Sequence, residues 1–306
     1  MRELIIISGK GGTGKTSLTA AFAALADNMV LCDTDVDAAD LHLLLDPVVE
    51  REEDFQGGSL AVIDGEKCID CGTCFEVCRF DAVRMKNGRH HIDPMSCEGC
   101  GVCVDLCPEK AIDFPLQTNG RWFISTTAHG PMVHARLGIA EENSGKLVSL
   151  LRRTAARLAR ERGLGLLLTD GPPGIGCPVI ASITGASAVL IVTEPTVSGL
   201  HDLQRVAGLA DHFKIPAMVV INRFDLNAQQ TIAIEELCRA RDLTLVGRIA
   251  FDPLFTRAMV AGKNLIHYAP QSAAAGSIRK IWRTIMETPA MREEQEKKYA
   301  IRRLNP

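Results

Sequence analysis

The sequence has few aromatic residues, only 5% of 306, and no long apolar run. No stretch approaches the ~18 apolar residues of a membrane-spanning helix, and the N-terminus lacks the charged, apolar and small-residue order of a signal peptide. An excess of one charge is also missing, because 34 Lys and Arg face 37 Asp and Glu. We therefore expect a cytoplasmic protein with no membrane anchor and no nucleic-acid partner.

The rest of the composition, 46% hydrophobic and 23% charged, is that of a globular protein and excludes disordered, collagen-like and coiled-coil classes. Helical stretches, the first at 16–26, separate most of the short apolar runs. These runs occupy residues 4–7, 29–32, 164–169, 188–193, 217–221 and 243–249. The alternation predicts an α/β fold with a doubly wound, mainly parallel sheet, in which ligands bind at the carboxyl ends of the strands.

Cysteine is the residue in excess. Eight of the 11 cysteines crowd between residues 68 and 107, and the spacing of the first four recurs in the second four. They are Cys68, Cys71, Cys74, Cys78, Cys97, Cys100, Cys103 and Cys107. In a reducing cytosol such crowding favours metal binding over disulfides.

The cysteine-rich segment interrupts the series of strands and helices. It spans residues 58–115 and contains a predicted hairpin at Asn87-Gly88. We expect a discontinuous main domain at 1–57 and 116–290, an inserted module at 58–115 and a charged tail at 291–306.

A glycine loop lies between the first predicted strand and the first helix, and it matches the phosphate-binding pattern GxxxxGK[ST]. The candidate ATP-binding residues here are Gly9, Lys10, Gly11, Gly12, Thr13, Gly14, Lys15, Thr16 and Ser17. In such loops backbone N–H groups surround phosphate oxygens, so Lys15 is expected on the outer phosphates and Thr16 on Mg²⁺.

Lys10 makes this loop resemble the deviant Walker A motif, KGGxGK[ST], of the ATPase class that includes MinD, ParA and the nitrogenase iron protein. The resemblance implies a P-loop ATPase that forms a homodimer on ATP binding. It implies that Lys10 acts on the nucleotide of the other subunit and makes Lys10, Lys15 and Asp35 the catalytic candidates.

Three further segments fit the same class. Asp35, in Asp33-Thr34-Asp35-Val36-Asp37, aligns with the aspartate that orients the attacking water and helps to organise Mg²⁺, although Asp33, Asp37 and Asp40 lie close enough to be confused with it. Asp170, before Gly171-Pro172-Pro173-Gly174, is expected to hold a water on Mg²⁺. Asn222-Arg223 resembles the adenine-contacting pair of the family, a weak signal by itself.

The cysteine spacing, x₂-x₂-x₃ in both halves with Pro108 after the second, is that of bacterial two-cluster ferredoxins. In that pattern the fourth cysteine of each run ligates the other cluster. We expect one [4Fe–4S] cluster on Cys68, Cys71, Cys74 and Cys107, and a second on Cys97, Cys100, Cys103 and Cys78. Two Cys₄ zinc sites are the alternative.

Two features of the sequence each allow two interpretations. Cys177 is expected to be a buried structural thiol, the alternative being a ligand that bridges two subunits. The segment from His129 to His134 is expected either to contact the clusters or a partner, or to be a surface loop before a helix near Glu141.

The whole chain resembles MinD-superfamily ATPases that carry a two-cluster ferredoxin module. The resemblance favours a dimeric switch that couples ATP hydrolysis to electron transfer, with a redox protein or an apo-metalloprotein as partner. One alternative is an iron–sulfur cluster carrier or assembly ATPase. The other is a MinD-like positioning ATPase whose ferredoxin module acts as a sensor.

Overall fold

The computed structural model describes residues 1–138 and 145–292. The chain divides into two compact units. Unit 1 takes in Met1–Glu52, Trp122–Arg136 and the chain from Asn143 on, and unit 2 takes in Glu53–Arg121 and Leu137–Glu142. Within the described ranges, no helix is both long and apolar enough to cross a bilayer.

Unit 1 is built on a nine-stranded sheet with the order β13-β12-β11-β1-β10-β2-β9-β8-β3. Its strands are β1 (Arg2–Ser8), β2 (Met29–Asp33), β3 (Val48–Ser59), β8 (Leu116–Thr127), β9 (Gly130–Leu137), β10 (Leu166–Pro173), β11 (Ala188–Thr193), β12 (Ala217–Asn222) and β13 (Thr244–Ile249). Every apolar run in the sequence became a strand, and those six strands pair in parallel. The expected α/β, mainly parallel sheet is confirmed.

The strands β9, β8 and β3 extend the sheet beyond β2, and none of them was expected from the sequence. β3 carries charged residues on both faces and is largely exposed, so it lacks the apolar pattern of a buried strand. Residues 130–134 lie in β9, which pairs in parallel with β2. The surface-loop interpretation of the His129–His134 segment is therefore wrong, and the expected helix start near Glu141 lies outside the described residues.

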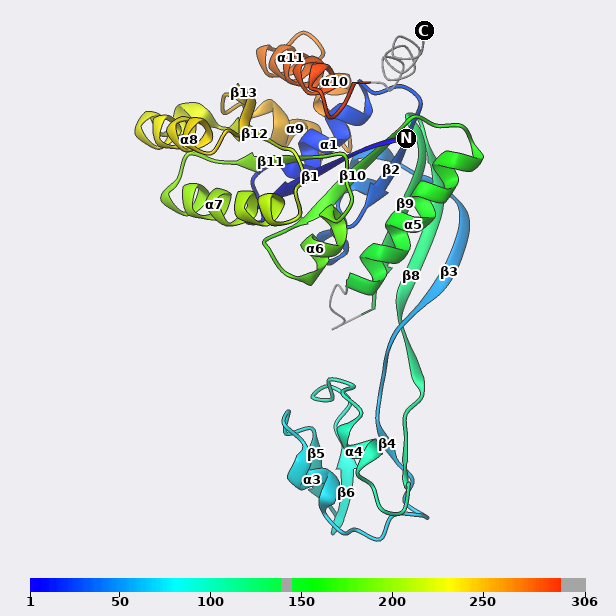
Figure 1. Ribbon diagram of the computed structural model, residues 1–306. Coiled ribbons are helices and arrows are strands. Elements are labelled where there is room, and N and C mark those ends of the chain that lie inside the picture. Colours follow the sequence, from blue (N-terminus) through cyan, green and yellow to red (C-terminus); the bar gives the residue numbers. More distant parts are fainter. Residues whose placement is uncertain (139–144, 293–306) are drawn as a thin grey trace, which may run out of the picture. The chain divides into compact units, whose positions relative to one another are not determined.

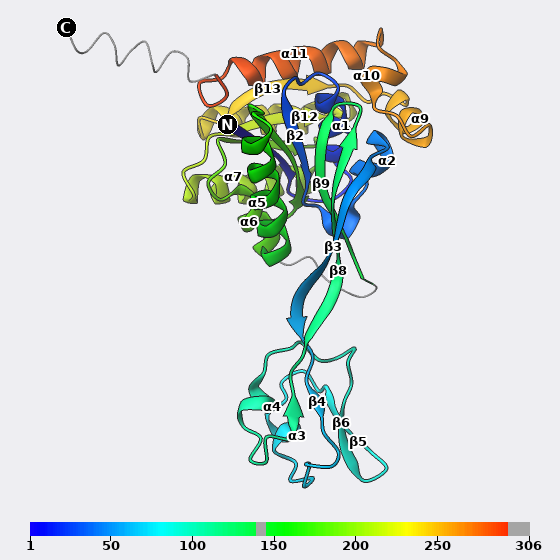
Figure 2. The same ribbon diagram turned by 90° about the vertical axis from the view of Figure 1, so that its right-hand side faces the viewer.

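Helices cover both faces of the sheet in unit 1 (Figures 1 and 2). They are α1 (Lys15–Ala23), α2 (Leu41–Leu45), α5 (Gly145–Glu161), α6 (Cys177–Ile183), α7 (Val197–His212), α8 (Ala228–Ala240), α9 (Leu254–Val260), α10 (Leu265–Tyr268) and α11 (Ala273–Glu287), with short 3₁₀ turns at Val36–Ala38 and Phe224–Leu226. Alternate residues of β1 point to opposite faces, so both faces of that central strand are apolar.

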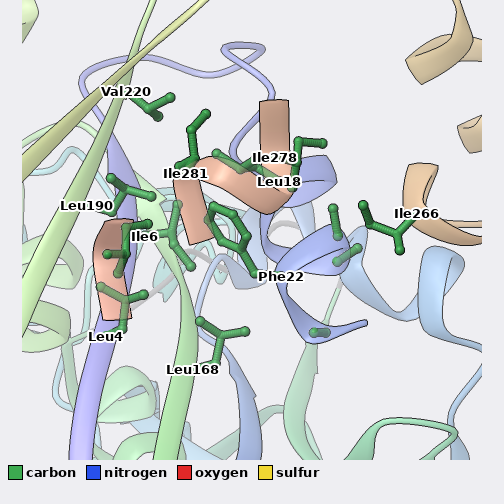
Figure 3. Packing of buried hydrophobic residues seen from close by; sticks show 14 of the residues in the cluster. Leu4, Ile6, Leu18, Phe22, Leu168, Leu190, Val220, Ile266, Ile278 and Ile281 are labelled. Atoms are coloured by element: carbon green, nitrogen blue, oxygen red, sulfur yellow. The ribbon is translucent and has the colours of Figure 1, made fainter. Parts of the chain in front are cut away.

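The two faces of β1 carry two separate cores. Leu4 and Ile6 pack with Phe22 of α1 and with Ile278 and Ile281 of α11 (Figure 3). On the other face, apolar residues of β1 pack against α6, α7 and α8. Met291 also belongs to the first core, so the packed chain continues one residue into the region expected to be tail; residues 293–306 lie outside the described part.

Unit 2 contains two small antiparallel ribbons and two short helices. The ribbons pair β4 (Val62–Ile63) with β7 (Ile112–Asp113), and β5 (Val83–Lys86) with β6 (Arg89–Ile92). The second ribbon turns at Asn87 and Gly88, so the predicted hairpin is confirmed. The helices α3 (Thr73–Val77) and α4 (Val102–Asp105) each follow a glycine with positive φ, Gly72 and Gly101, which occupy equivalent positions in the repeat.

Candidate functional site

A hollow of unit 1 lies over the glycine loop between β1 and α1 and has a volume of about 980 Å³. It is bounded by the loop, by the start of the segment after β2, and by the residues that follow β12 and β13. The expected ATP-binding residues that line it are Gly11, Gly12, Thr13, Gly14, Lys15, Thr16, Ser17, Asn222 and Arg223, and Asp35 lines it as well. Gly9, Lys10 and Asp170 do not line it.

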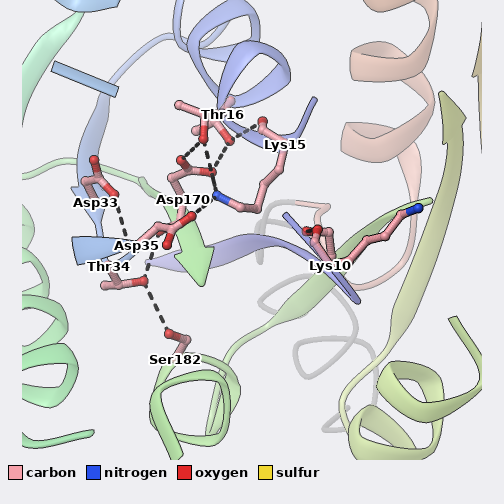
Figure 4. A network of polar contacts seen from close by, with 10 residues as sticks. Lys10, Lys15, Thr16, Asp33, Thr34, Asp35, Asp170 and Ser182 are labelled. Atoms are coloured by element: carbon pink, nitrogen blue, oxygen red, sulfur yellow. Dashed lines mark hydrogen bonds and ion pairs between the residues drawn. The ribbon is translucent and has the colours of Figure 1, made fainter. Parts of the chain in front are cut away.

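Lys15 is the centre of the polar network beside this hollow (Figure 4). Its Nζ lies 2.9 Å from Oδ2 of Asp35 and 3.0 Å from Oδ1 of Asp170. Burial acts to lower the pKa of this amine, but the carboxylates of Asp170 and Asp35 outweigh it and the net pKa is raised. Lys15 therefore stays charged, although its side chain is buried.

Asp170 joins three residues of α1 to the end of β10. Besides the ion pair with Lys15, it accepts hydrogen bonds from the hydroxyl of Thr16 at 2.7 Å and from that of Thr19 at 2.9 Å. The structure thus brings together the threonine that is expected to bind Mg²⁺ and the aspartate that is expected to hold a water on it. Thr19 was not among the expected residues, because nothing in the motif marks it.

The four aspartates at and after the end of β2, Asp33, Asp35, Asp37 and Asp40, differ in burial. Asp35 contacts Lys15, whereas Asp33 accepts a hydrogen bond from the Asp35 backbone N–H at 3.1 Å and leaves its Oδ2 buried without a hydrogen-bond partner. Burial raises the pKa of both carboxyl groups, against the opposing charge of Lys15. Asp37 is exposed, and Asp40 reaches only the rim of the hollow. Among the four candidates, Asp35 is the one in contact with the loop lysine.

Lys10 lies on the other side of the loop, with 34% of its side chain exposed. Its Nζ is 3.2 Å from the hydroxyl of Ser198 and 3.6 Å from a carboxylate oxygen of Glu194. Glu194 also pairs with Arg223. Glu194 could not be identified from the sequence, because an isolated glutamate after a strand carries no motif.

The Asn222-Arg223 pair lies at the end of β12, beside the glycine loop. The amide of Asn222 donates to the Thr13 carbonyl at 2.8 Å, and a Cβ on Gly14 would lie 2.5 Å from that amide nitrogen. Gly14 has φ +91°, so this close approach explains why glycine stands there. The aromatic residues Phe251 and Phe255 also line the hollow but were missed, since they belong to no recognised motif.

In unit 2, cysteines line a pair of hollows of about 360 Å³ each. The structure brings together the same two sets of four that the sequence suggests. Cys68, Cys71, Cys74 and Cys107 line one, and Cys78, Cys97, Cys100 and Cys103 line the other. Yet across the described ranges no group of three or more His, Cys, Asp or Glu side chains could hold a metal ion as it stands.

Backbone N–H groups approach the cysteine sulfur atoms in a repeated way. The N–H of Ala82 lies 3.4 Å from Cys78 Sγ, and the N–H of Ala111 lies 3.3 Å from Cys107 Sγ, at equivalent places in the repeat. Such contacts stabilise thiolates. Burial raises the pKa of Cys74 and Cys103, one in each hollow.

Two other expectations concerned residues outside these sites. Cys177, the first residue of α6, is exposed, so the interpretation as a buried structural thiol is wrong. His134 is buried beside Phe123, and its Nε2 lies 2.8 Å from the Ser125 hydroxyl. Burial and the nearby His42 lower the pKa of His134 to about 4.

Comparisons with known proteins agree with the geometry of unit 1. An uncharacterized protein of Methanocaldococcus jannaschii is 32% identical over 228 residues, 74% of this chain and 79% of its own length. The septum site-determining protein MinD of Pyrococcus horikoshii, solved with Mg-ADP, has a similar fold (TM-score 0.57, 17% identity, 94% of this chain and 96% of that one). So does a MinC:MinD complex chain of Aquifex aeolicus (TM-score 0.58, 18% identity, 94% and 96%).

The family model of the CobQ/CobB/MinD/ParA nucleotide binding domain matches residues 4–266, which include the glycine loop, Asp35, Asp170 and Asn222. Members of the MinD and ParA group are ATPases, so ATPase activity is supported at the level of the family. With most of its length matched, the chain belongs to the CobQ/CobB/MinD/ParA nucleotide-binding family.

Proposed function

We propose that this protein is a MinD-like switch ATPase, which binds MgATP in the hollow of unit 1 and alternates between a nucleotide-free and an ATP-bound state. The observation that carries the proposal is the placement of Lys15 between Asp35 and Asp170. The relatives and fold neighbours favour this reading over coupling of ATP to electron transfer, which the sequence alone had favoured.

The ion pairs of Lys15 give the switch a physical basis. Without nucleotide, both carboxylates neutralise the lysine. Phosphate oxygens of ATP are competing anions, so binding draws the lysine toward the phosphates and releases Asp35 and Asp170. Asp35 then becomes free to orient the attacking water, and Asp170 to hold a water on the metal.

The side chains beside Lys15 suit Mg²⁺, which prefers oxygen ligands and keeps several waters. The hydroxyl of Thr16 and the carboxylate of Asp170 are already 2.7 Å apart. The buried Oδ2 of Asp33, which has no hydrogen-bond partner, is a further oxygen atom nearby. When bound, Mg²⁺ would neutralise charge on the phosphates; Thr16 would hold it directly, and Asp170 and Asp35 through water.

Dimerisation on ATP is part of the proposal. Lys10 lies outside the chain's own hollow and is partly exposed, with its Nζ 3.2 Å from Ser198, 3.4 Å from Thr196 and 3.6 Å from Glu194. A lysine placed in this way is available to the nucleotide of a second copy. The MinC:MinD complex of Aquifex aeolicus further suggests that the closed dimer docks a regulatory protein.

The first test measures nucleotide binding and mass together. Fluorescent ATP is titrated onto the protein with Mg²⁺, and light scattering after size exclusion compares the protein with and without MgATP. We expect saturable binding and a mass that rises from 33.1 kDa to twice that value with ATP. Absence of binding by the intact wild-type protein would refute the proposal.

The paired cysteine hollows favour a second role for the chain, as a carrier of two [4Fe–4S] clusters in unit 2. A single-metal site needs its ligands around one point, whereas the four thiolates of a cubane bind four different irons and stand apart. Four cysteines around each hollow fit the second requirement. When bound, the clusters would supply one-electron chemistry; the cysteines hold them, and the N–H groups of Ala82 and Ala111 stabilise the thiolates.

Iron and acid-labile sulfide analysis of anaerobically purified protein, with EPR after reduction, tests this second role. About eight irons per chain and signals of two reduced clusters are expected. Signals that shift with MgATP would return weight to coupled electron transfer. Rapid loss of one cluster to an apo-protein would favour a carrier, and zinc in place of iron would overturn the assignment.

A further inference from the structure

A buried chain of hydroxyl groups connects the segment after β2 with β10 and α6 (Figure 4). The hydroxyl of Thr34 lies 2.9 Å from the Asp170 carbonyl oxygen and 3.2 Å from the hydroxyl of Ser182. Ser182 Oγ in turn lies 2.9 Å from the carbonyl oxygen of Pro178, one turn earlier in α6. Thr34 and Ser182 are both fully buried, so water does not compete for these contacts.

The two hydroxyl groups make more contacts than they have protons. Each hydroxyl donates one hydrogen bond, but three contacts are present. With Thr34 donating to Asp170, Ser182 donates either to Thr34 or to Pro178. With Ser182 donating to Pro178, Thr34 donates either to Asp170 or to Ser182. The bond between the two side chains is kept in the two arrangements that leave one of the backbone carbonyls without a hydroxyl donor.

The position of Thr34 determines which segments are affected by this choice of hydrogen-bond partners. Thr34 stands between Asp33 and Asp35, and its backbone N–H also donates to the Asp170 carbonyl at 2.8 Å. Its hydroxyl therefore adds a second link between the segment that carries Asp35 and the strand that carries Asp170. Through Ser182 the same link reaches α6, which follows directly on the Gly171–Gly174 loop.

We propose that Thr34 and Ser182 are positioning residues, which keep Asp35 in register with Asp170 by tying both to α6. When Ser182 donates to Pro178 and Thr34 donates to Ser182, the Thr34 hydroxyl releases the Asp170 carbonyl while the tie to α6 persists. The catalytic part of this inference rests on the proposed ATPase function, whereas the link itself does not.

Three variants test the kinetic consequence. Ser182→Ala and Thr34→Val remove one hydroxyl each, and Thr34→Ser retains it. Neither residue lines the nucleotide hollow, so we expect kcat for ATP hydrolysis to fall about fivefold, the effect of one neutral hydrogen bond, with KM changed less than twofold. Thr34→Ser keeps the hydroxyl and is expected to retain the kcat of the wild type. A raised KM with unchanged kcat, or no rescue by Thr34→Ser, would overturn the positioning role.

Hydrogen–deuterium exchange on the nucleotide-free protein tests the link without any reliance on activity. Ser182→Ala is expected to speed exchange in residues 33–40, and Thr34→Val to speed it in α6. Ser149→Ala is the matched control, because the Ser149 hydroxyl bonds the Gly145 carbonyl of its own helix at 2.7 Å, and it should change neither segment. Faster exchange confined to the substituted element refutes the link. A wild-type protein that binds no ATP refutes the proposed function instead, while the exchange result still decides the link.

Discussion

Lys15 and Asp170 are 155 residues apart in the sequence, yet the lysine Nζ lies 3.0 Å from Oδ1 of the aspartate. The contact follows from the parallel pairing of β1 with β10, in which Ile6 is opposite Asp170. The strand pairing therefore places Asp170 against the first turn of α1. Substitutions in this network are expected to separate nucleotide binding from hydrolysis.

Lys15→Ala is expected to weaken ATP binding at least 100-fold, because no other side chain that lines the hollow offers a buried cation on the loop side. Titration with fluorescent ATP measures the loss. Lys280→Ala, an exposed lysine of α11, is the control and should bind as the wild type does. Iron content, if present, should not change in either variant. Normal binding by Lys15→Ala would place the phosphates elsewhere.

Asp35→Ala is expected to bind ATP normally and to hydrolyse it about 100-fold more slowly, since loss of a group that orients water removes that scale of rate. Asp37→Ala, two residues away and exposed, provides the comparison. Single-turnover hydrolysis at saturating ATP measures both. If Asp37→Ala is the slower variant, the catalytic assignment belongs to Asp37.

Arg152 and Arg153 are neighbours in α5 but differ in exposure. The guanidinium of Arg152 pairs with Glu3 at 2.6 Å and donates to the carbonyls of Ala181 and Thr184. Arg152→Ala leaves the nearly buried Glu3 carboxylate without that partner and is expected to destabilise unit 1 by about 3 kcal/mol. Arg153→Ala, exposed one residue later, should cost less than about 0.5 kcal/mol. Urea unfolding followed by tryptophan fluorescence reports unit 1, which holds both Trp122 and Trp282. Equal losses would show that the Glu3 pair adds nothing.

The lowered pKa of His134 predicts an acid-sensitive unit 1. The unfolded chain takes up a proton near pH 6.5 that the folded chain refuses until about pH 4. Stability is therefore complete above pH 6.5 and is lost as pH falls toward 4. From pH 7.5 to 5.5 the loss is about 1.3 kcal/mol. His134→Phe should remove this slope from urea midpoints, whereas His201→Gln, an exposed control, should keep it.

Substitution of the fourth cysteine in each run should show which cysteines share a cluster. If each hollow takes one cluster, Cys107→Ser and Cys71→Ser should each lower iron from about eight to about four per chain and eliminate the same EPR signal. Cys78→Ser should eliminate the other signal. The exposed Cys177 provides the matched control, and Cys177→Ser should retain all iron. Loss of one shared signal from Cys107→Ser and Cys97→Ser would contradict the crossed assignment.

The features that could be predicted from the sequence are those that a local pattern of residues determines. A strand such as β1 is apolar on both faces, and the glycine loop and the cysteine spacing are short motifs, so each could be identified without a fold. β3 could not, because its residues are charged and it forms a strand only by pairing with β8 in the sheet. The burial of His134 and the exposure of Cys177 likewise depend on elements far away in sequence. Glu194 and Thr19 matter through contacts that no spacing encodes.

The adjacency of β3 and β8 has a consequence for the chain as a whole. The backbone leaves unit 1 along β3 and returns along β8, its neighbour in the sheet, so the ends of the excursion are held side by side. Because the entropic cost of closing a loop grows only slowly with its length, the segment between these two strands can be long or short with a modest difference in free energy. A short turn could therefore replace residues 53–121, and conversely the same two strands form an anchorage at which an unrelated module could be accommodated without redesign of the ATPase.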